Sequence, residues 1–120
     1  MKQLKNVYKE MNSLEKRQDE ASRMVHKYSG KIPVIVLMDP LTKSKEKIYK
    51  YLISGDLEGM YIMKLIRNKI VIDPSKGLFC LTEKDQVLLT NSMVFRDIYR
   101  RYKDEDGFLY LTILVENTFG

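Results

Sequence analysis

The feature that most constrains the fold is a long apolar run close to the C-terminal end of the chain. Residues 108–115 hold seven apolar side chains in eight positions, rich in aromatic and β-branched types, which is typical of a strand buried on both faces. Since only a fully covered position tolerates so apolar a strand, we expect it to lie in the middle of a sheet, parallel to the first strand. An acidic turn at 104–107 precedes the run, and a polar tail at 116–120 follows it and ends in glycine.

Hydrophobic periodicity and turn residues divide the rest of the chain into short elements. The expected elements are, in order, helices at 2–11 and 14–28, strands at 31–37 and 48–53, a helix at 57–70, short strands at 78–82 and 86–89, and a last helix after a cap at 90–92. The order predicts an α+β fold in which two helices precede a sheet.

Capping residues and apolar stripes give the expected boundaries and faces of the helices. Asn12, with Glu15 three residues later, is expected to cap the second helix, and Asp56 the third. On the second helix, Lys16 and Glu20 are spaced to form an ion pair. The buried face of that helix is expected to consist of Leu14, Ala21, Val25 and Tyr28. The last helix is expected to present one broad apolar face made of Val94, Phe95, Ile98, Tyr99 and Tyr102.

Composition limits the class of protein. A chain of 120 residues has the length of a single domain, and no apolar run approaches the roughly 20 residues of a membrane-spanning helix. One cysteine excludes an internal disulfide and fits a reducing compartment. The net charge of +5 suits an anionic partner such as a lipid surface or nucleic acid, or serves solubility alone. The basic segment 2–11 either packs its apolar stripe on the domain or contacts a membrane or an acidic partner.

The sequence offers no set of residues typical of an active site. His26 is the sole histidine, Cys80 lies inside an apolar strand, and no glycine-rich phosphate loop follows a strand. We therefore expect no catalytic residue, no metal site and no cofactor.

The strand at 48–53 is a candidate for peptide binding. Its side chains alternate, so that Tyr49, Tyr51 and Ile53 face one way while Lys50 and Leu52 face the other. An exposed strand edge of this kind can accept an extended peptide through main-chain hydrogen bonds. The alternative is that the aromatic side chains belong to the core and that Lys50 protects a sheet edge from aggregation.

Several stretches of the sequence resemble the autophagy ubiquitin-like modifiers, the family of the GABA-receptor-associated proteins and microtubule-associated light chains. The matching stretches are Val7-Tyr8-Lys9-Glu10, Leu14-Glu15-Lys16-Arg17, Lys31-Ile32-Pro33-Val34-Ile35-Val36, Leu65-Ile66-Arg67-Asn68-Lys69-Ile70, Asp104-Glu105-Asp106-Gly107-Phe108-Leu109-Tyr110 and the final Glu116-Asn117-Thr118-Phe119-Gly120. The resemblance runs from about Val7 to Gly120, nearly the whole chain.

The resemblance implies a ubiquitin-like β-grasp fold with two additional N-terminal helices. On this basis residues 1–28 form a helical subdomain packed on the core, residues 29–115 form the β-grasp core, and residues 116–120 form a flexible tail that ends in the conjugation glycine. All three parts belong to one compact domain.

The resemblance also implies a function. Gly120 would be joined by activating and conjugating enzymes to the amino group of phosphatidylethanolamine, and a cysteine protease would process and delipidate the protein. Thr118 and Phe119 would be recognised by these enzymes. The chain, itself not an enzyme, would act in the cytoplasm and, lipid-anchored, on autophagosomal membranes, where it would support membrane growth and recruit receptors.

Such receptors carry aromatic-x-x-aliphatic motifs, which the family binds in two pockets beside the strand at 48–53. Carried over by matching motifs, the aromatic pocket consists of Glu20, Met24, Pro33, Lys50, Leu52 and Phe108. The aliphatic pocket consists of Tyr51, Ile53, Leu57, Ile62 and Leu65. Lys31 and Lys69 match basic positions that contact the acidic residues flanking such motifs.

The sequence departs from the family in places. Ile53-Ser54-Gly55-Asp56-Leu57 replaces the usual Val-Pro-x-Asp-Leu, Ile62 replaces an aromatic residue, and the Pro-Pro expected after the strand at 78–82 is absent. We therefore expect a reshaped aliphatic pocket.

Two alternative functions remain open. One is an unconjugated adaptor of the same fold that binds acidic peptides or tubulin, and the other is a modifier joined to protein lysines. Nucleic acid is not an expected partner, since the chain has no RNA-binding aromatic signature.

Overall fold

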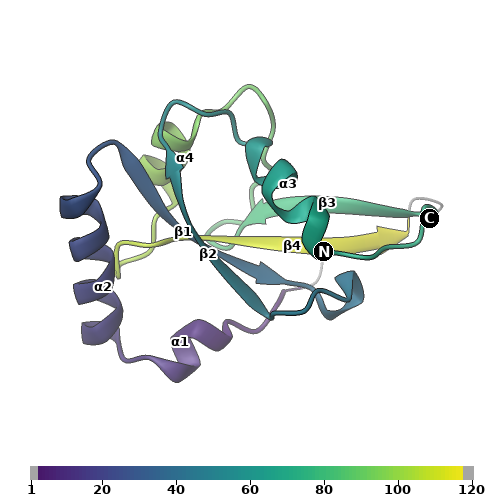
Figure 1. Cartoon of the computed structure of the whole chain (residues 1–120), viewed down its shortest axis with the longest axis horizontal. Coiled ribbons are helices and arrows are strands. Elements are labelled where there is room, and N and C mark those ends of the chain that lie inside the picture. The colour runs from purple at the N-terminus through teal and green to yellow at the C-terminus, as the bar shows by residue number, and fades with distance from the viewer. Residues whose placement is uncertain (1–2, 118–120) are drawn as a thin grey trace.

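The computed structural model describes residues 3–117 and is built on one mixed sheet (Figure 1). The four strands lie in the order β2-β1-β4-β3. Their bounds are β1 Lys31–Met38, β2 Ile48–Ser54, β3 Lys76–Thr82 and β4 Leu109–Asn117. The helices are α1 Val7–Met11, α2 Leu14–Lys27, α3 Tyr61–Ile66 and α4 Phe95–Tyr102, with short 3-10 turns η1 Pro40–Thr42 and η2 Arg67–Lys69.

The two central strands are β1 and β4, and they run parallel. Their register pairs Val34 with Leu109 and Met38 with Ile113, while β2 and β3 flank them in antiparallel orientation. Leu109, Leu111, Ile113 and the side chains between them are buried. The expected central and parallel position of the last strand is therefore confirmed.

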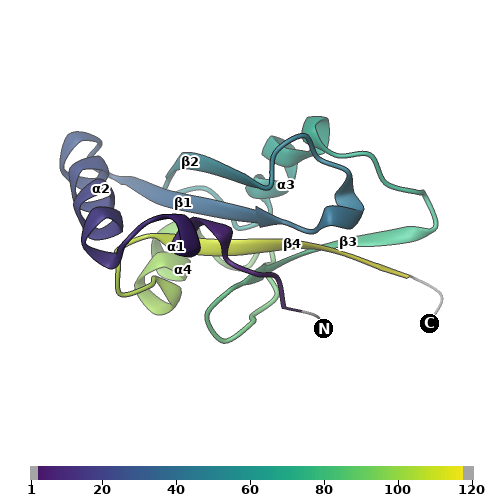
Figure 2. The same ribbon diagram turned by 90° about the horizontal axis from the view of Figure 1, so that it is seen from below.

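Helices cover both faces of the sheet, as the second view shows (Figure 2). On one face, α3 and α4 contribute Ile62, Ile66, Phe95 and Ile98 to a core that includes alternate residues of the central strands. On the other face, α1 and α2 contribute Tyr8 and Ala21 to a smaller core, whose strand and turn residues are Ile35, Leu37, Phe108 and Tyr110. The alternation of side chains along each strand explains why two separate cores form.

Helix α2 occupies nearly its expected range, but its cap and its buried face differ from the prediction. Ser13 is the N-cap and accepts a hydrogen bond from the Lys16 amide, while Asn12 ends α1 and donates from its side chain to the Tyr8 carbonyl. Ala21 is buried as expected, together with Arg17, but three members of the predicted face are exposed: Leu14, Val25 and Tyr28. Arg17 faces inward because its guanidinium donates a hydrogen bond to Asp106, an acidic residue in the core.

The third helix is shorter than predicted, because the segment before it pairs with another part of the chain. Glu58 forms a β-bridge with Val94, and the Gly59 amide donates to the Met93 carbonyl at 2.7 Å. These backbone groups are then unavailable to a helix, so α3 begins at Tyr61. Asp56 accepts a hydrogen bond from Arg96 instead of capping the helix.

Three other boundaries also differ. Helix α1 begins at Val7, with the Asn6 side chain as its cap, and not at residue 2. Residues 86–89 form one isolated bridge, Leu88 to Leu81, in place of a strand. Helix α4 begins at Phe95 with Val94 at the N-cap position, which has no side-chain cap, and the hydroxyls of Thr90 and Ser92 bond to each other.

Gly59 fits a space that has no room for a side chain. A Cβ at this position would lie 2.9 Å from the carbonyl oxygen of Thr90 and 3.2 Å from Cδ1 of Ile98. We expect Gly59→Ala to lower the free energy of unfolding by about 1–3 kcal/mol, the usual range for overpacking. Urea unfolding measures this loss. Gly55→Ala is the matched control, since the nearest atom to its Cβ would be Cβ of Arg96 at 3.3 Å and not a backbone oxygen at 2.9 Å, and an equal loss in both variants would contradict this account.

Candidate peptide groove and C-terminal tail

Strand β2 lies at an edge of the sheet and pairs with β1 alone. An edge strand leaves one row of its backbone donors and acceptors unpaired, so an extended peptide can add to it as a further strand. The side chains alternate as predicted, because Tyr49, Tyr51 and Ile53 belong to the core under α3 while Lys50 faces α1 and α2. The edge therefore separates two surfaces of different character.

On the α2 side, three polar groups from three elements meet beside β2. Lys50 forms an ion pair and hydrogen bond with Glu20 of α2, and the Tyr8 hydroxyl of α1 donates to the same carboxylate. The Lys50 ammonium also lies 4.8 Å from the centre of the Tyr8 ring. Tyr8 therefore fixes both charged residues of the predicted aromatic pocket, a role that the sequence reasoning did not assign to it.

The electrostatics of this cluster follow from the same contacts. Burial alone would raise the pKa of Glu20, but hydrogen bonds from Lys50 and Tyr8 and the charges of Lys50 and Arg23 hold it below its usual value. Burial and the hydrogen bond to Glu20 raise the pKa of Tyr8 well above its ordinary value. Glu20 is therefore a carboxylate and Tyr8 a neutral donor at neutral pH.

The apolar members of the predicted aromatic pocket also gather on this side. Leu52 pairs across the sheet with Pro33, and Met24 of α2 is half-buried against the smaller core. Phe108 is fully buried, and its ring meets that of Tyr8 edge-on with centroids 5.7 Å apart. Phe108 thus supports the floor of this surface from beneath.

On the α3 side, the residues of the predicted aliphatic pocket divide into core and surface. Ile53 and Ile62 are buried, whereas Tyr51, Leu57 and Leu65 are half-buried against them. The accessible part of the pocket therefore comes from these last three side chains. The Tyr51 hydroxyl is buried and has no hydrogen-bond partner within residues 3–117. Burial, followed by the charge of Tyr49, raises the pKa of Tyr51, so its hydroxyl stays a neutral donor.

The two basic residues predicted to contact acidic flanks lie at opposite ends of β2. Lys31 pairs in the sheet with Ser54, at the C-terminal end of the strand. Lys69 lies near the other end, with its ammonium 5.2 Å from the centre of the Tyr49 ring. Both side chains are exposed, so the positive charge brackets the edge strand.

A buried ion pair anchors α2 behind the groove. Arg17 donates to Asp106 at 2.7 Å, and the Tyr110 hydroxyl donates to the same carboxylate. Burial would lower the pKa of Arg17, but the hydrogen bonds and charges of Asp106 and Tyr110 raise it on balance. Lys9 of α1 adds an ion pair with Asp104 in the same acidic turn. One signal in the sequence could have indicated these contacts, namely the acidic turn at 104–107.

The last described residues lead toward the tail from the centre of the sheet. The buried carboxylate of Asp39 accepts from the Val115 amide at 2.9 Å, and the Asp39 amide donates to the Ile113 carbonyl at 2.9 Å. This pair of bonds fixes the end of β4. The predicted conjugation residue Gly120, with Thr118 and Phe119, lies outside the described residues.

Metal-ligand clusters and the single cysteine were the candidates for chemistry in the described part of the chain. Within residues 3–117, no group of three or more His, Cys, Asp or Glu side chains is placed to hold a metal ion. Cys80 is buried, and burial raises the pKa of its thiol, so the thiolate needed for nucleophilic attack is suppressed. No helix among these residues has the length and apolarity needed to cross a membrane.

Comparison with known proteins places this geometry in a family. The family model described as "Autophagy protein Atg8 ubiquitin like" matches residues 16–120. The chain belongs to the Atg8 family. Autophagy-related protein 8 of Colletotrichum lindemuthianum and that of Neurospora crassa are each 39% identical to it over 121 residues, covering 98% of this chain and 96% of theirs.

The fold agrees with a solved member of the Atg8 family. The crystal structure of Trypanosoma brucei ATG8 matches with a TM-score of 0.77 and 28% sequence identity, covering 98% of this chain and 100% of that one. The expected ubiquitin-like α+β fold is therefore confirmed.

The Glu20 cluster makes stability depend on pH in a defined direction. Because the pKa of Glu20 is depressed in the folded state, its stabilising effect is present above the unfolded-state pKa of about 4.3 and is lost as the pH falls through the folded value. We expect Glu20→Gln to lower the thermal midpoint at pH 7, with a difference from the unchanged chain that shrinks on acidification. Glu15→Gln is the control, since Glu15 is an exposed residue of the same helix. A Glu20→Gln deficit that is independent of pH would refute the assignment.

Proposed function

We propose that this Atg8-family chain is a ubiquitin-like modifier joined through Gly120 to the amino headgroup of phosphatidylethanolamine on autophagic membranes. Anchored there, it supports membrane growth and recruits receptors that carry aromatic-x-x-aliphatic motifs. It is a substrate of activating, conjugating and processing enzymes and not an enzyme itself. The observation that carries the proposal is the central strand β4, whose end leads directly into the segment that ends in Gly120.

The structure supports this proposal by its arrangement of edge and tail. The free edge of β2 and the end of β4 that leads into the tail lie at different places in the sheet, because β1 separates β2 from β4. A peptide can therefore bind at β2 while the tail is held elsewhere. Gly120 has no side chain, which lets a narrow enzyme channel enclose it.

The groove supports recognition of an extended peptide in three ways. The β2 backbone offers hydrogen bonds, the Leu52 side and the Tyr51–Leu57–Leu65 side offer apolar contact, and Lys31 and Lys69 attract acidic flanks. The buried Tyr51 hydroxyl donates no hydrogen bond within residues 3–117. Leaving such a group unpaired lowers the free energy of unfolding by about 1–3 kcal/mol. A peptide acceptor that reaches it would remove this cost, so we assign Tyr51 to recognition.

Reconstituted conjugation tests the modifier function. The purified chain, with Atg8-family activating and conjugating enzymes, ATP and phosphatidylethanolamine vesicles, should gain the mass of one lipid minus one water. Deleting Gly120 should abolish the product, because the terminal carboxyl group then belongs to Phe119, whose bulky side chain does not fit a narrow enzyme channel.

Cys80→Ser is the matched control for this experiment and should still be conjugated, since the thiol is buried. A lipid adduct on the chain that lacks Gly120 would overturn the assigned acceptor. An adduct on protein lysines in place of lipid would favour a protein modifier, and no adduct with active enzymes would favour an unconjugated adaptor.

Peptide titration tests the groove. Leu52→Ala should weaken binding of an aromatic-x-x-aliphatic peptide by about 2 kcal/mol or more, roughly 30-fold, as for an interface hot spot. Calorimetry at two salt concentrations measures it, with Leu88→Ala as an exposed leucine control away from β2. Unchanged affinity of Leu52→Ala, or binding that disappears with salt in every variant, would place recognition elsewhere.

A further inference from the structure

Two exposed apolar side chains lie side by side near the end of β4. Leu41 of η1 is 55% exposed and Val71 of the loop before β3 is 67% exposed. The Val71 amide donates to the Thr42 carbonyl at 2.8 Å, and both side chains line one hollow of about 470 Å³ together with Val115. Single exposed apolar residues are ordinary, but a pair brought together from two loops forms a patch.

The loop between β1 and β2 adds positive charge next to this patch. Lys43, Lys45 and Lys47 are exposed, and none of the three forms an ion pair with another residue in the range 3–117. Two acidic residues accompany them. Glu46 is exposed, and Asp73 lines the hollow with Lys43. The lysines outnumber these carboxylates by one.

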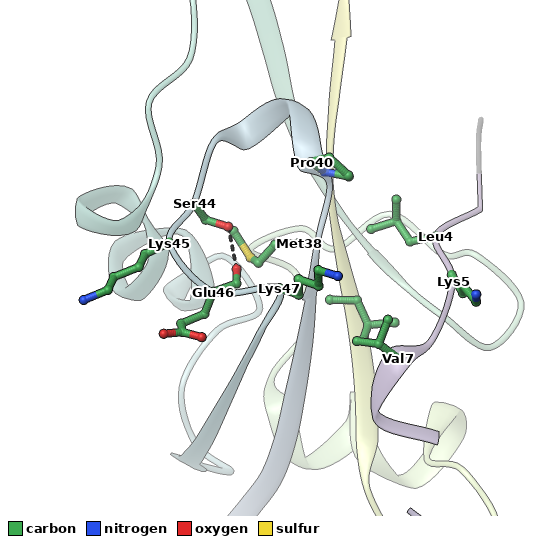
Figure 3. Close-up of a pocket in the computed structure, with 10 residues that line it drawn as sticks. Leu4, Lys5, Val7, Met38, Pro40, Ser44, Lys45, Glu46 and Lys47 are labelled. Atoms are coloured by element: carbon green, nitrogen blue, oxygen red, sulfur yellow. Dashed lines mark hydrogen bonds between the residues drawn. The ribbon is translucent and has the colours of Figure 1, made fainter. Parts of the chain in front are cut away.

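A second hollow also borders η1, and part of its wall is apolar. It has a volume of about 430 Å³ and lies between the N-terminal segment and the same loop (Figure 3). Leu4 and Val7 line one side and Pro40 and Met38 the other, while Lys45 and Lys47 stand at the loop. The lysines of this loop therefore border apolar side chains in both hollows.

The tail leaves the sheet from this end of the molecule. Asp39, the N-cap of η1, forms hydrogen bonds with the Val115 and Ile113 backbone, so η1 and the end of β4 are fixed to each other. Val115 lies five positions before Gly120, and five fully extended residues span at most about 17 Å. A lipid joined to Gly120 thus keeps this end within about two Debye lengths of the membrane surface.

We propose that the exit surface, defined as Leu41, Lys43, Lys45, Lys47 and Val71, contacts anionic phospholipid when the tail is anchored. The lysines face the lipid phosphates, and Leu41 and Val71 enter the boundary between headgroups and acyl chains. This inference rests on the proposed function, because the anchor supplies the proximity. Charge selects the partner, since each lysine near an anionic surface strengthens the attraction about fivefold.

A chemical tether tests the exit surface without the conjugating enzymes. Gly120→Cys is coupled to a maleimide-headgroup lipid in vesicles, a reaction that spares Cys80 because its thiol is buried. The chain contains no tryptophan, so Leu41→Trp or Val71→Trp introduces a single fluorescent reporter. Val25→Trp is the control, because Val25 is also exposed but lies on α2, at the opposite end of the sheet (Figure 1).

On vesicles that contain phosphatidylserine, we expect the emission of the Leu41→Trp and Val71→Trp chains to shift to the blue. Brominated lipid should quench both, whereas the Val25→Trp chain should be unaffected. Changing Lys43, Lys45 and Lys47 to Gln together, or using vesicles of neutral lipid alone, should reduce the quenching several-fold.

Three results would overturn the inference: no quenching at either site on a fully tethered chain, equal quenching at Val25, or equal quenching on neutral vesicles. Suppression of quenching by an acidic peptide that binds the exit surface more tightly than the vesicles do would assign this surface to a protein. Because the tether bypasses enzymatic transfer, such failures leave the proposed conjugation untouched. If enzymatic conjugation alone failed, the quenching measured on the tethered chain would still test the exit surface.

Discussion

The parallel pairing of β1 with β4 is the constraint on which the rest of the structure depends. Two adjacent central strands are apolar on both faces, so each face must be covered before the sheet is stable in water. Helices α3 and α4 cover one face and α1 and α2 the other. Because β4 occupies one side of β1, β2 pairs with the other side of β1 and lies at the edge of the sheet. There a peptide can reach its backbone.

The N-terminal helices depend on polar contacts as much as on apolar ones. Their core is small, and Arg17 and Lys9 join them to the acidic turn before β4. A buried ion pair of this kind adds little net stability over an apolar pair, but removing one partner leaves an unpaired charge and is strongly unfavourable. The turn therefore fixes where α2 lies, and α2 in turn carries Glu20 to the edge strand.

The sequence predicted the four strands of the sheet, whose alternation of side chains agrees with their neighbours, but the further strand expected at 86–89 was wrong. The long run before the tail was central and parallel, and the alternation along β2 separated Tyr49, Tyr51 and Ile53 from Lys50 as expected. Helices were less predictable. A pattern of apolar residues suggested that α2 buries Leu14 and Val25, whereas a charged Arg17 is buried because its partner lies 89 positions away.

Backbone pairing between distant segments also explains why the third helix is shorter than predicted. Leu57 to Gly59 have a helical pattern, but their backbone pairs with residues 93–95, and no local signal indicates this. In the candidate site, motif matching brought together residues that do lie on two sides of β2. It did not separate Phe108 and Ile62, which are fully buried, from the accessible side chains, and it did not assign a role to Tyr8.

The placement of β4 has a mechanical consequence for an anchored protein. A pull on the tail acts along β4, and the hydrogen bonds to β1 on one side and β3 on the other lie across that direction. The load is therefore shared by both ladders at once, in shear, instead of opening one bond after another. Anchored through its tail as proposed, the domain would transmit force between a membrane and a bound partner while the strand that bears the load stays in place.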